Sequence, residues 1–119
     1  MDIEVKEALQ QSIKTPNTNF LETLYNGSIG DYLYEIQKVS DERQNILIVA
    51  HNPSIYELII LLAAQGQDSI MQRLSEGYKP ATLSIIECKC KSWKDIQPAV
   101  NKLTNLFDPL DYNAPARPT

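Results

Sequence analysis

The stretch Ile46-Leu47-Ile48-Val49-Ala50-His51-Asn52-Pro53 decides the fold class of this chain. Its first five residues are apolar without alternation, which is typical of a strand that is covered on both faces, as in a parallel sheet. Asn52 is a good N-cap and Pro53 a good first helical residue. The stretch therefore predicts a strand over residues 46–50 and a largely buried helix over residues 53–65, ended by Gly66.

The residues before this stretch carry further signals for a helix, a strand and a second helix. Apolar positions at helical spacing predict helices over residues 3–14 and about 29–39. Ser28 and Asp31 have the spacing of a capping box at the start of the second helix. Residues 20–25 read as a short strand between the two helices.

The residues after the stretch continue the alternation. One further helix is expected within residues 67–77, with Ser69 and Gln72 as its capping pair. Strands are expected over residues 82–88 and 102–107. Helices that alternate with strands favour an α/β layered domain with helix–sheet–helix architecture.

Length and composition agree with one globular unit. The chain has 119 residues, of which 43% are hydrophobic. We therefore expect a single domain over residues 1–110 and a loose, proline-containing tail over residues 111–119. The net charge of −4 and the lack of a basic run argue against a nucleic-acid partner.

The sequence also argues against a membrane span and a zinc site. Its longest apolar run, residues 58–64, is far shorter than the ~20 residues that span a bilayer, so no membrane partner is expected. No secretory signal is readable and the expected location is cytoplasmic. Cys88 and Cys90 read as two reduced thiols, because a zinc site needs about four ligands and the chain has a single histidine.

The junction at His51 is the place where chemistry is expected. Ligands of open α/β sheets gather beyond the carboxyl ends of strands, and a helix N-terminus there offers free N–H groups and the positive end of a dipole. Asn52, Ser54 and Ile55 would supply such N–H groups, and His51 would donate a hydrogen bond to a phosphoryl oxygen. The alternative, in which His51 merely caps or fills space at a strand end, stays open on residue type alone.

The same residues resemble a known family. Residues 46–53 look like the second signature of the histidine phosphatase (phosphoglycerate mutase-like) superfamily, in particular the small SixA-type phosphohistidine phosphatases. The likeness runs in the family's order over roughly residues 19–110, through Leu24-Tyr25-Asn26-Gly27-Ser28, Pro80-Ala81-Thr82-Leu83-Ser84, Trp93 and Phe107-Asp108-Pro109.

This resemblance implies a metal-independent hydrolase that acts on phosphohistidine or phosphomonoesters and needs no cofactor. A nucleophilic histidine takes the phosphoryl group, while a second histidine and two arginines hold it. His51 matches the second histidine, a catalytic and phosphate-binding residue. Asn52 matches the position after it, whose N–H faces phosphate.

The chain departs from the family at the nucleophile. It contains no Arg-His-Gly motif, and Arg43, Arg73 and Arg117 lie where the family has no pocket arginine. The resemblance thus covers the C-terminal two-thirds of such an enzyme and predicts a histidine-phosphatase-like domain that lacks the first central strand. The expected function is a truncated SixA-like phosphatase domain, inactive alone, whether the truncation is biological or a start-site or frameshift artefact. The alternative is a non-catalytic module that binds a phosphorylated ligand or a protein.

The resemblance also predicts partners and secondary site residues. A missing strand leaves residues 46–50 with an open edge, which invites a homo-oligomer or a separately encoded N-terminal fragment. Glu22 is a candidate general acid, against the plainer reading of a solvated carboxylate. Tyr25, Tyr32 and Tyr34 are candidates for a pocket mouth, against the plainer reading of core or rim packing.

Overall fold

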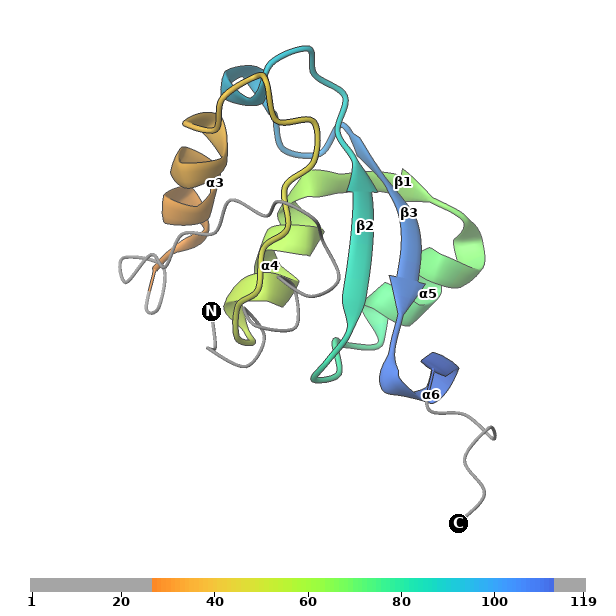
Figure 1. Ribbon diagram of the computed structural model, residues 1–119. Helices are drawn as coiled ribbons and strands as arrows, with labels where there is room; N and C mark the ends of the chain where they lie inside the picture. The colour runs from red at the N-terminus through yellow and green to blue at the C-terminus, as the bar shows by residue number, and fades with distance from the viewer. Residues whose placement is uncertain (1–26, 113–119) are drawn as a thin grey trace.

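The computed structural model describes residues 27–112, and a mixed three-stranded sheet runs through this part of the chain (Figure 1). The central strand is β3 (Asn101–Phe107), which pairs in parallel with β1 (Ala63–Gly66) and antiparallel with β2 (Leu83–Glu87). The strands that were predicted over residues 82–88 and 102–107 are confirmed, and so is the α/β class.

The longer helices lie on one side of this sheet. They are α3 (Ile29–Gln37), α4 (Ser54–Leu62) and α5 (Asp68–Ser75), followed by the short α6 (Pro109–Tyr112), with a 3-10 turn, η1, at Trp93–Asp95. The helix predictions for residues 29–39 and 67–77 are confirmed, with shorter bounds. The helix predicted over 3–14 and the strand predicted over 20–25 lie outside the described residues.

The start of α3 follows the predicted capping box, whereas the start of α5 does not. Ser28 Oγ accepts from the Asp31 N–H at 3.3 Å, and Asp31 Oδ2 accepts from the Ser28 N–H at 2.8 Å. The prediction that Ser69 and Gln72 form the capping pair of this helix is wrong. α5 already begins at Asp68, and its N-cap, Gln67, makes no side-chain capping hydrogen bond.

The predicted strand over residues 46–50 is wrong, because this segment does not join the sheet. Residues 44–50 make no backbone–backbone hydrogen bond with any part of the chain between residues 27 and 112. Ile46, Ile48 and Ala50 pack on the core, but Leu47 is 47% exposed and Val49 37% exposed. The run is thus covered on one face only, and no described strand lies beside it to complete a ladder.

The helix predicted over residues 53–65 is shorter at both ends, and its last turn is replaced by a strand that the sequence did not reveal. Pro53 is the N-cap, not the first helical residue, and α4 ends at Leu62. Ala63 then starts β1, where a Cβ on Gly66 would lie 2.8 Å from the Leu103 carbonyl oxygen. Gly66 therefore permits a close approach of two strands, which is a different role from the predicted helix stop.

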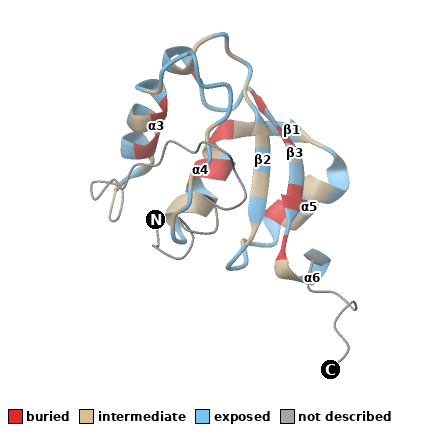
Figure 2. Cartoon of the chain, viewed as in Figure 1, coloured by how far each residue is buried: buried red, intermediate tan, exposed pale blue. Residues whose placement is uncertain are grey.

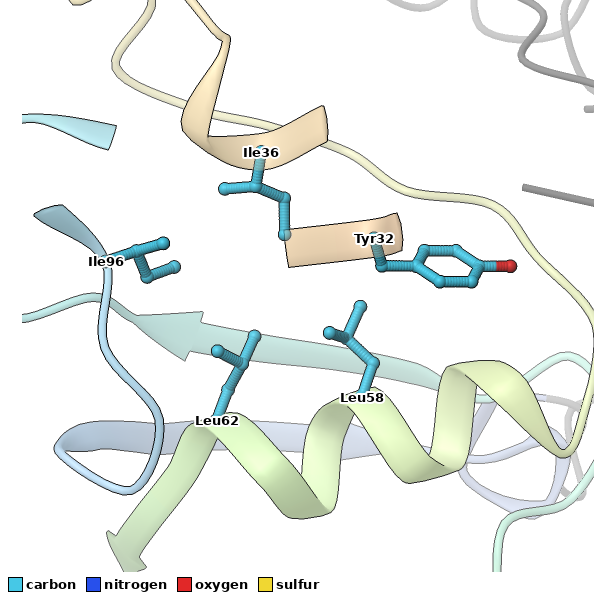
Figure 3. Packing of buried hydrophobic residues seen from close by; sticks show 5 residues of the cluster. All are labelled: Tyr32, Ile36, Leu58, Leu62 and Ile96. Atoms are coloured by element: carbon cyan, nitrogen blue, oxygen red, sulfur yellow. The ribbon is translucent and has the colours of Figure 1, made fainter. Parts of the chain in front are cut away.

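Two clusters of buried side chains form the core, and α4 contributes to both. The first lies between α3 and α4 and includes Tyr32, Ile36, Leu58, Leu62 and Ile96 (Figure 3). The second lies between α4, α5 and the sheet and includes Ile59, Leu74, Leu103 and Leu106. Ile86 of β2 packs against both clusters, so both lie on one face of the sheet.

The other face of the sheet has no helical layer among residues 27–112, so the predicted helix–sheet–helix architecture is not seen in this part. Figure 2 shows the alternation of exposed and partly buried positions along β2. Within the same residues, no helix is long and apolar enough to cross a bilayer.

The segment after β3 is anchored by charge. Asp108 is 8% exposed, and Arg73 Nη2 lies 2.8 Å from both Asp108 Oδ2 and Asp111 Oδ2. The domain boundary that was predicted after residue 110 therefore falls within α6. Residues 113–119 of the predicted tail lie outside the described residues.

Candidate functional site

His51 lies at the end of the extended segment, three residues before α4 begins. His51 is exposed, and its carbonyl oxygen accepts a hydrogen bond from the Ile55 N–H at 3.1 Å. That bond occupies one of the donors that the sequence counted as free, so the Ile55 prediction is wrong. Within the described ranges, the N–H groups of Asn52 and Ser54 have no backbone partner and remain the donors of this turn.

Asn52 does not cap α4. Its Nδ2 instead donates to the Tyr78 carbonyl oxygen at 2.7 Å, across 26 positions of sequence. This bond joins the turn at residues 51–53 to the loop at residues 76–82, between α5 and β2. The sequence prediction that Asn52 caps the helix is wrong, and the sequence missed the bond to Tyr78 because a long-range side-chain bond leaves no local signal.

The loop at residues 76–82 is held in place by several contacts. The Tyr78 hydroxyl lies 2.7 Å from Ser84 Oγ, and the rings of Tyr56 and Tyr78 are 5.7 Å apart. Burial raises the pKa of Tyr78, against the opposing effect of the Ser84 hydrogen bond. Ala81 has a positive φ of 62°, which is uncommon for a residue other than glycine. The loop that the Asn52 side chain contacts is therefore held in place through Tyr78.

A small pocket is lined by residues of α5, this loop and the end of β3. Its two cations are Lys79 and Arg73, and Arg73 also donates from Nη1 to the Leu106 carbonyl oxygen at 3.2 Å. The hydrogen bonds from Arg73 lower the pKa values of Asp108 and Asp111 and, in return, raise that of Arg73. Arg73 is thus a clamp between α5 and α6, committed to two carboxylates, and the sequence missed this role.

The candidate tyrosines divide into core and rim. Tyr32 is 3% exposed, and burial raises its pKa in spite of a side-chain hydrogen bond with Ser54. Tyr34 is 61% exposed, with Lys38 Nζ 5.0 Å from its ring centre. The burial of Tyr32 and the exposed position of Tyr34 agree with the plainer reading of core and rim packing. Glu22 and Tyr25 lie outside the described residues.

The two thiols form no metal centre with described residues. Cys88 and Cys90 are free and half-buried, and burial raises the pKa of both. Residues 27–112 contain no group of three or more His, Cys, Asp or Glu side chains that could hold a metal ion.

Comparison with known proteins gives relatives without an assigned activity. The chain is 28% identical over 92 residues to the uncharacterized proteins MT1313 and Rv1276c, from two strains of Mycobacterium tuberculosis. The alignment covers 76% of this chain, and the chain spans 58% of the length of each relative. No family model and no solved structure matches this chain. The histidine phosphatase resemblance therefore stays a prediction that the residues around His51 carry.

Proposed function

We propose that His51, Asn52 and Ser54 form the phosphoryl-binding half of a SixA-like phosphohistidine or phosphomonoester phosphatase site. The observation that carries this proposal is the position of the His51 turn directly before α4, with two N–H groups that have no backbone partner among residues 27–112. A helix N-terminus attracts anions through its N–H groups and its dipole. A histidine at that point adds a ring N–H donor to the same oxygen atoms.

The proposed chemistry is incomplete in this chain alone. Transfer of a phosphoryl group to the enzyme needs a nucleophile beside the residue that holds the group. His51 is the single histidine of the sequence and is already assigned to the holding role. We therefore expect no turnover by the family's mechanism from the isolated chain.

Binding of the anion is expected to be weak. Arg73, the nearest arginine by sequence to the loop at residues 76–82, is engaged by Asp108 and Asp111 at 2.8 Å each. A hydrogen bond to a charged group is worth on the order of 1.5–3 kcal/mol, so a site without pocket arginines loses most of its affinity. The expected dissociation constant for inorganic phosphate is roughly millimolar, which corresponds to about −4 kcal/mol.

A second candidate function, an interaction module, is favoured by a separate observation. Leu47 and Val49 are exposed, and their backbone makes no hydrogen bond to another described segment. Open strand edges pair with other chains. On this reading, residues 46–50 accept a strand from a second copy or from a separately encoded N-terminal fragment. The expected result for the first case is a sedimentation coefficient that rises with protein concentration.

The experiment that tests the phosphatase proposal follows the His51 ring resonances while phosphate or vanadate is added at constant pH. We expect saturable shifts with a millimolar midpoint, and loss of phosphate binding in His51→Ala, read from the amide resonances of Asn52 and Ser54. Gln65→Ala, a neutral exposed change at β1, serves as the control. Unchanged ring resonances would reject the site.

A parallel assay with a generic aryl phosphate tests the missing nucleophile. We expect no hydrolysis above background from the wild-type chain or from His51→Ala. Hydrolysis that depends on His51 would mean that His51 itself attacks phosphorus, and the proposed division of roles would then be wrong.

A further inference from the structure

One face of the sheet is left without a helical cover within residues 27–112. On this outer sheet face, Leu83 of β2 stands opposite Phe107 of β3, and Ile85 stands opposite Asn105. Leu83 and Ile85 are each 44% exposed and Phe107 is 39% exposed. Cross-strand neighbours on one face lie close together, so these three side chains form one apolar area at the end of the sheet near loop 76–82.

The opposite end of the same face is basic. Glu87 stands opposite Lys102, and the chain continues from β2 through Lys89 and Lys91, which are both exposed. Three lysines, one carboxylate and Val100, which is 41% exposed, line one shallow hollow there, so its charged groups are Lys89, Lys91, Lys102 and Glu87. None of these three lysines forms an ion pair with a described residue, although the whole chain carries a net charge of −4.

We propose that the outer sheet face docks an acidic amphipathic helix of a partner protein. The apolar side chains of that helix would cover Leu83, Ile85 and Phe107, and its carboxylates would meet Lys89, Lys91 and Lys102. Lys89 follows Leu83 by six positions, so an extended chain covers roughly 20 Å between them, the length of a helix of about 13 residues.

Charge decides between this occupant and the others. Two copies that packed face to face would each bring three lysines and a single carboxylate, that of Glu87, so most of the lysines would meet lysines or apolar side chains of the other copy. A nucleic acid would satisfy the lysines but would leave the apolar end without a partner. An acidic helix with an apolar stripe complements both ends at once, which is how interfaces gain specificity. This inference is independent of the phosphate proposal.

The test uses the full chain and synthetic helical peptides with a fluorescent label. Each acidic peptide has 14 residues, leucines at positions i, i+3, i+4 and i+7, and glutamates in one half. Versions with the acidic half at either end are compared with peptides in which lysine replaces every glutamate. We expect fluorescence anisotropy to show at least tenfold tighter binding of one acidic peptide than of its basic counterpart, with an affinity that falls as salt rises.

Charge reversal then locates the binding. The double variant K89E/K102E should prefer the basic peptide, whereas Lys38→Glu on α3 should behave as wild type. Amide resonances of the wild-type chain, recorded with the acidic peptide, should shift at residues 83–91 and 102–107. This mapping needs no variant to fold.

Several results would overturn the proposal. Equal binding of acidic and basic peptides would do so, and so would shifts confined to residues 44–51. Concentration-dependent association of the chain alone that Leu83→Ser abolishes would assign the face to a second copy. Tighter binding of a single-stranded oligonucleotide than of the acidic peptides, lost in K89E/K102E, would assign it to nucleic acid.

Discussion

Residues 46–50 and strand β2 are similar in sequence but differ in hydrogen bonding. In both segments alternate side chains point to the core, namely Ile46 and Ile48 in one and Ile86 in the other. The opposite faces are similarly exposed, at 47% and 37% for Leu47 and Val49 against 44% for Leu83 and Ile85. Only β2 pairs with another strand of the described chain. An apolar run therefore predicts an extended backbone with one buried face, whereas a ladder also requires a neighbouring strand.

The largest expected effect comes from truncating leucines in the two regions. Leu103 of β3 is fully buried, so Leu103→Ala should lower the free energy of unfolding by about 2–5 kcal/mol. Leu47→Ala, at the half-exposed position in residues 46–50, should cost less than about 1 kcal/mol. Urea unfolding of the two variants at one protein concentration measures the difference.

Equal losses in Leu103→Ala and Leu47→Ala would contradict the comparison. They would mean that residues 46–50 are covered on both faces in solution, as the sequence alone suggested. If the stability loss caused by Leu47→Ala grows with protein concentration while that caused by Leu103→Ala does not, a second copy covers Leu47.

A smaller effect is expected at Asn101, which begins β3. Asn101 is fully buried, donates to the Leu62 and Gln97 carbonyl oxygens at 3.0 and 2.8 Å, and accepts from the Lys89 N–H at 2.9 Å. Asn101→Ala removes the partner of these three backbone groups, and an unsatisfied buried polar group lowers the free energy of unfolding by about 1–3 kcal/mol. Asn105→Ala, at an exposed position of the same strand, is the matched control. Thermal melts should separate the two variants by several degrees, and equal melting temperatures would refute the anchoring role of Asn101.

The next effect is a pH dependence at the end of β3. Arg73 depresses the pKa values of Asp108 and Asp111, so the ionised carboxylates stabilise the folded chain. That contribution is complete above the unfolded aspartate pKa of about 3.9 and is lost as the pH falls through the lower folded values. Arg73→Gln should therefore be less stable than wild type at pH 6, and the two should converge in acid. A stability gap that does not narrow below pH 4 would mean that Arg73 acts through packing.

The smallest expected effect concerns the thiols after β2. Cys88 and Cys90 pack against the same cluster as Ile46 and Ile48, and burial raises their pKa values. Alkylation proceeds through the thiolate, so both should react more slowly with iodoacetamide at pH 8 than in the urea-unfolded chain. Ile48→Ala should speed the reaction if residues 46–50 cover the thiols, whereas Ile60→Ala should not. Equal rates in all variants would show that the segment gives no cover.

Local patterns predicted the elements whose signals lie within a few residues. The structure confirms the capping box at Ser28 and Asp31, and it confirms the strand predicted from the β-branched residues of β2. β1 was missed because Ala63-Ala64-Gln65-Gly66 has no strand-forming side chains, and only pairing with β3 makes it a strand. The strand prediction for residues 46–50 was wrong for the reverse reason, since the local signal is strong but no described strand lies beside the segment to pair with it.

The candidate site shows the same limit. The sequence singled out His51 and Asn52 from their place before a helix, and the helix indeed starts close behind them. It did not reveal the bond from Asn52 to Tyr78 or the clamp of Arg73 on Asp108, because both join residues more than 25 positions apart. The sequence therefore predicted a position for a ligand, which stays a prediction, whereas it gave no signal for the long-range contacts around that position.

Amide hydrogen exchange of the wild-type chain, resolved residue by residue, tests most directly whether residues 46–50 lack a ladder. We expect slow exchange in the central strand β3, at positions such as Leu103 that have partners on both sides, and fast exchange at Leu47 and Val49 under the same conditions. The measurement is made at low concentration, where any association through the open segment is weakest. Protection at Leu47 and Val49 as strong as that at Leu103 would contradict this expectation, because these amides would then belong to a paired strand.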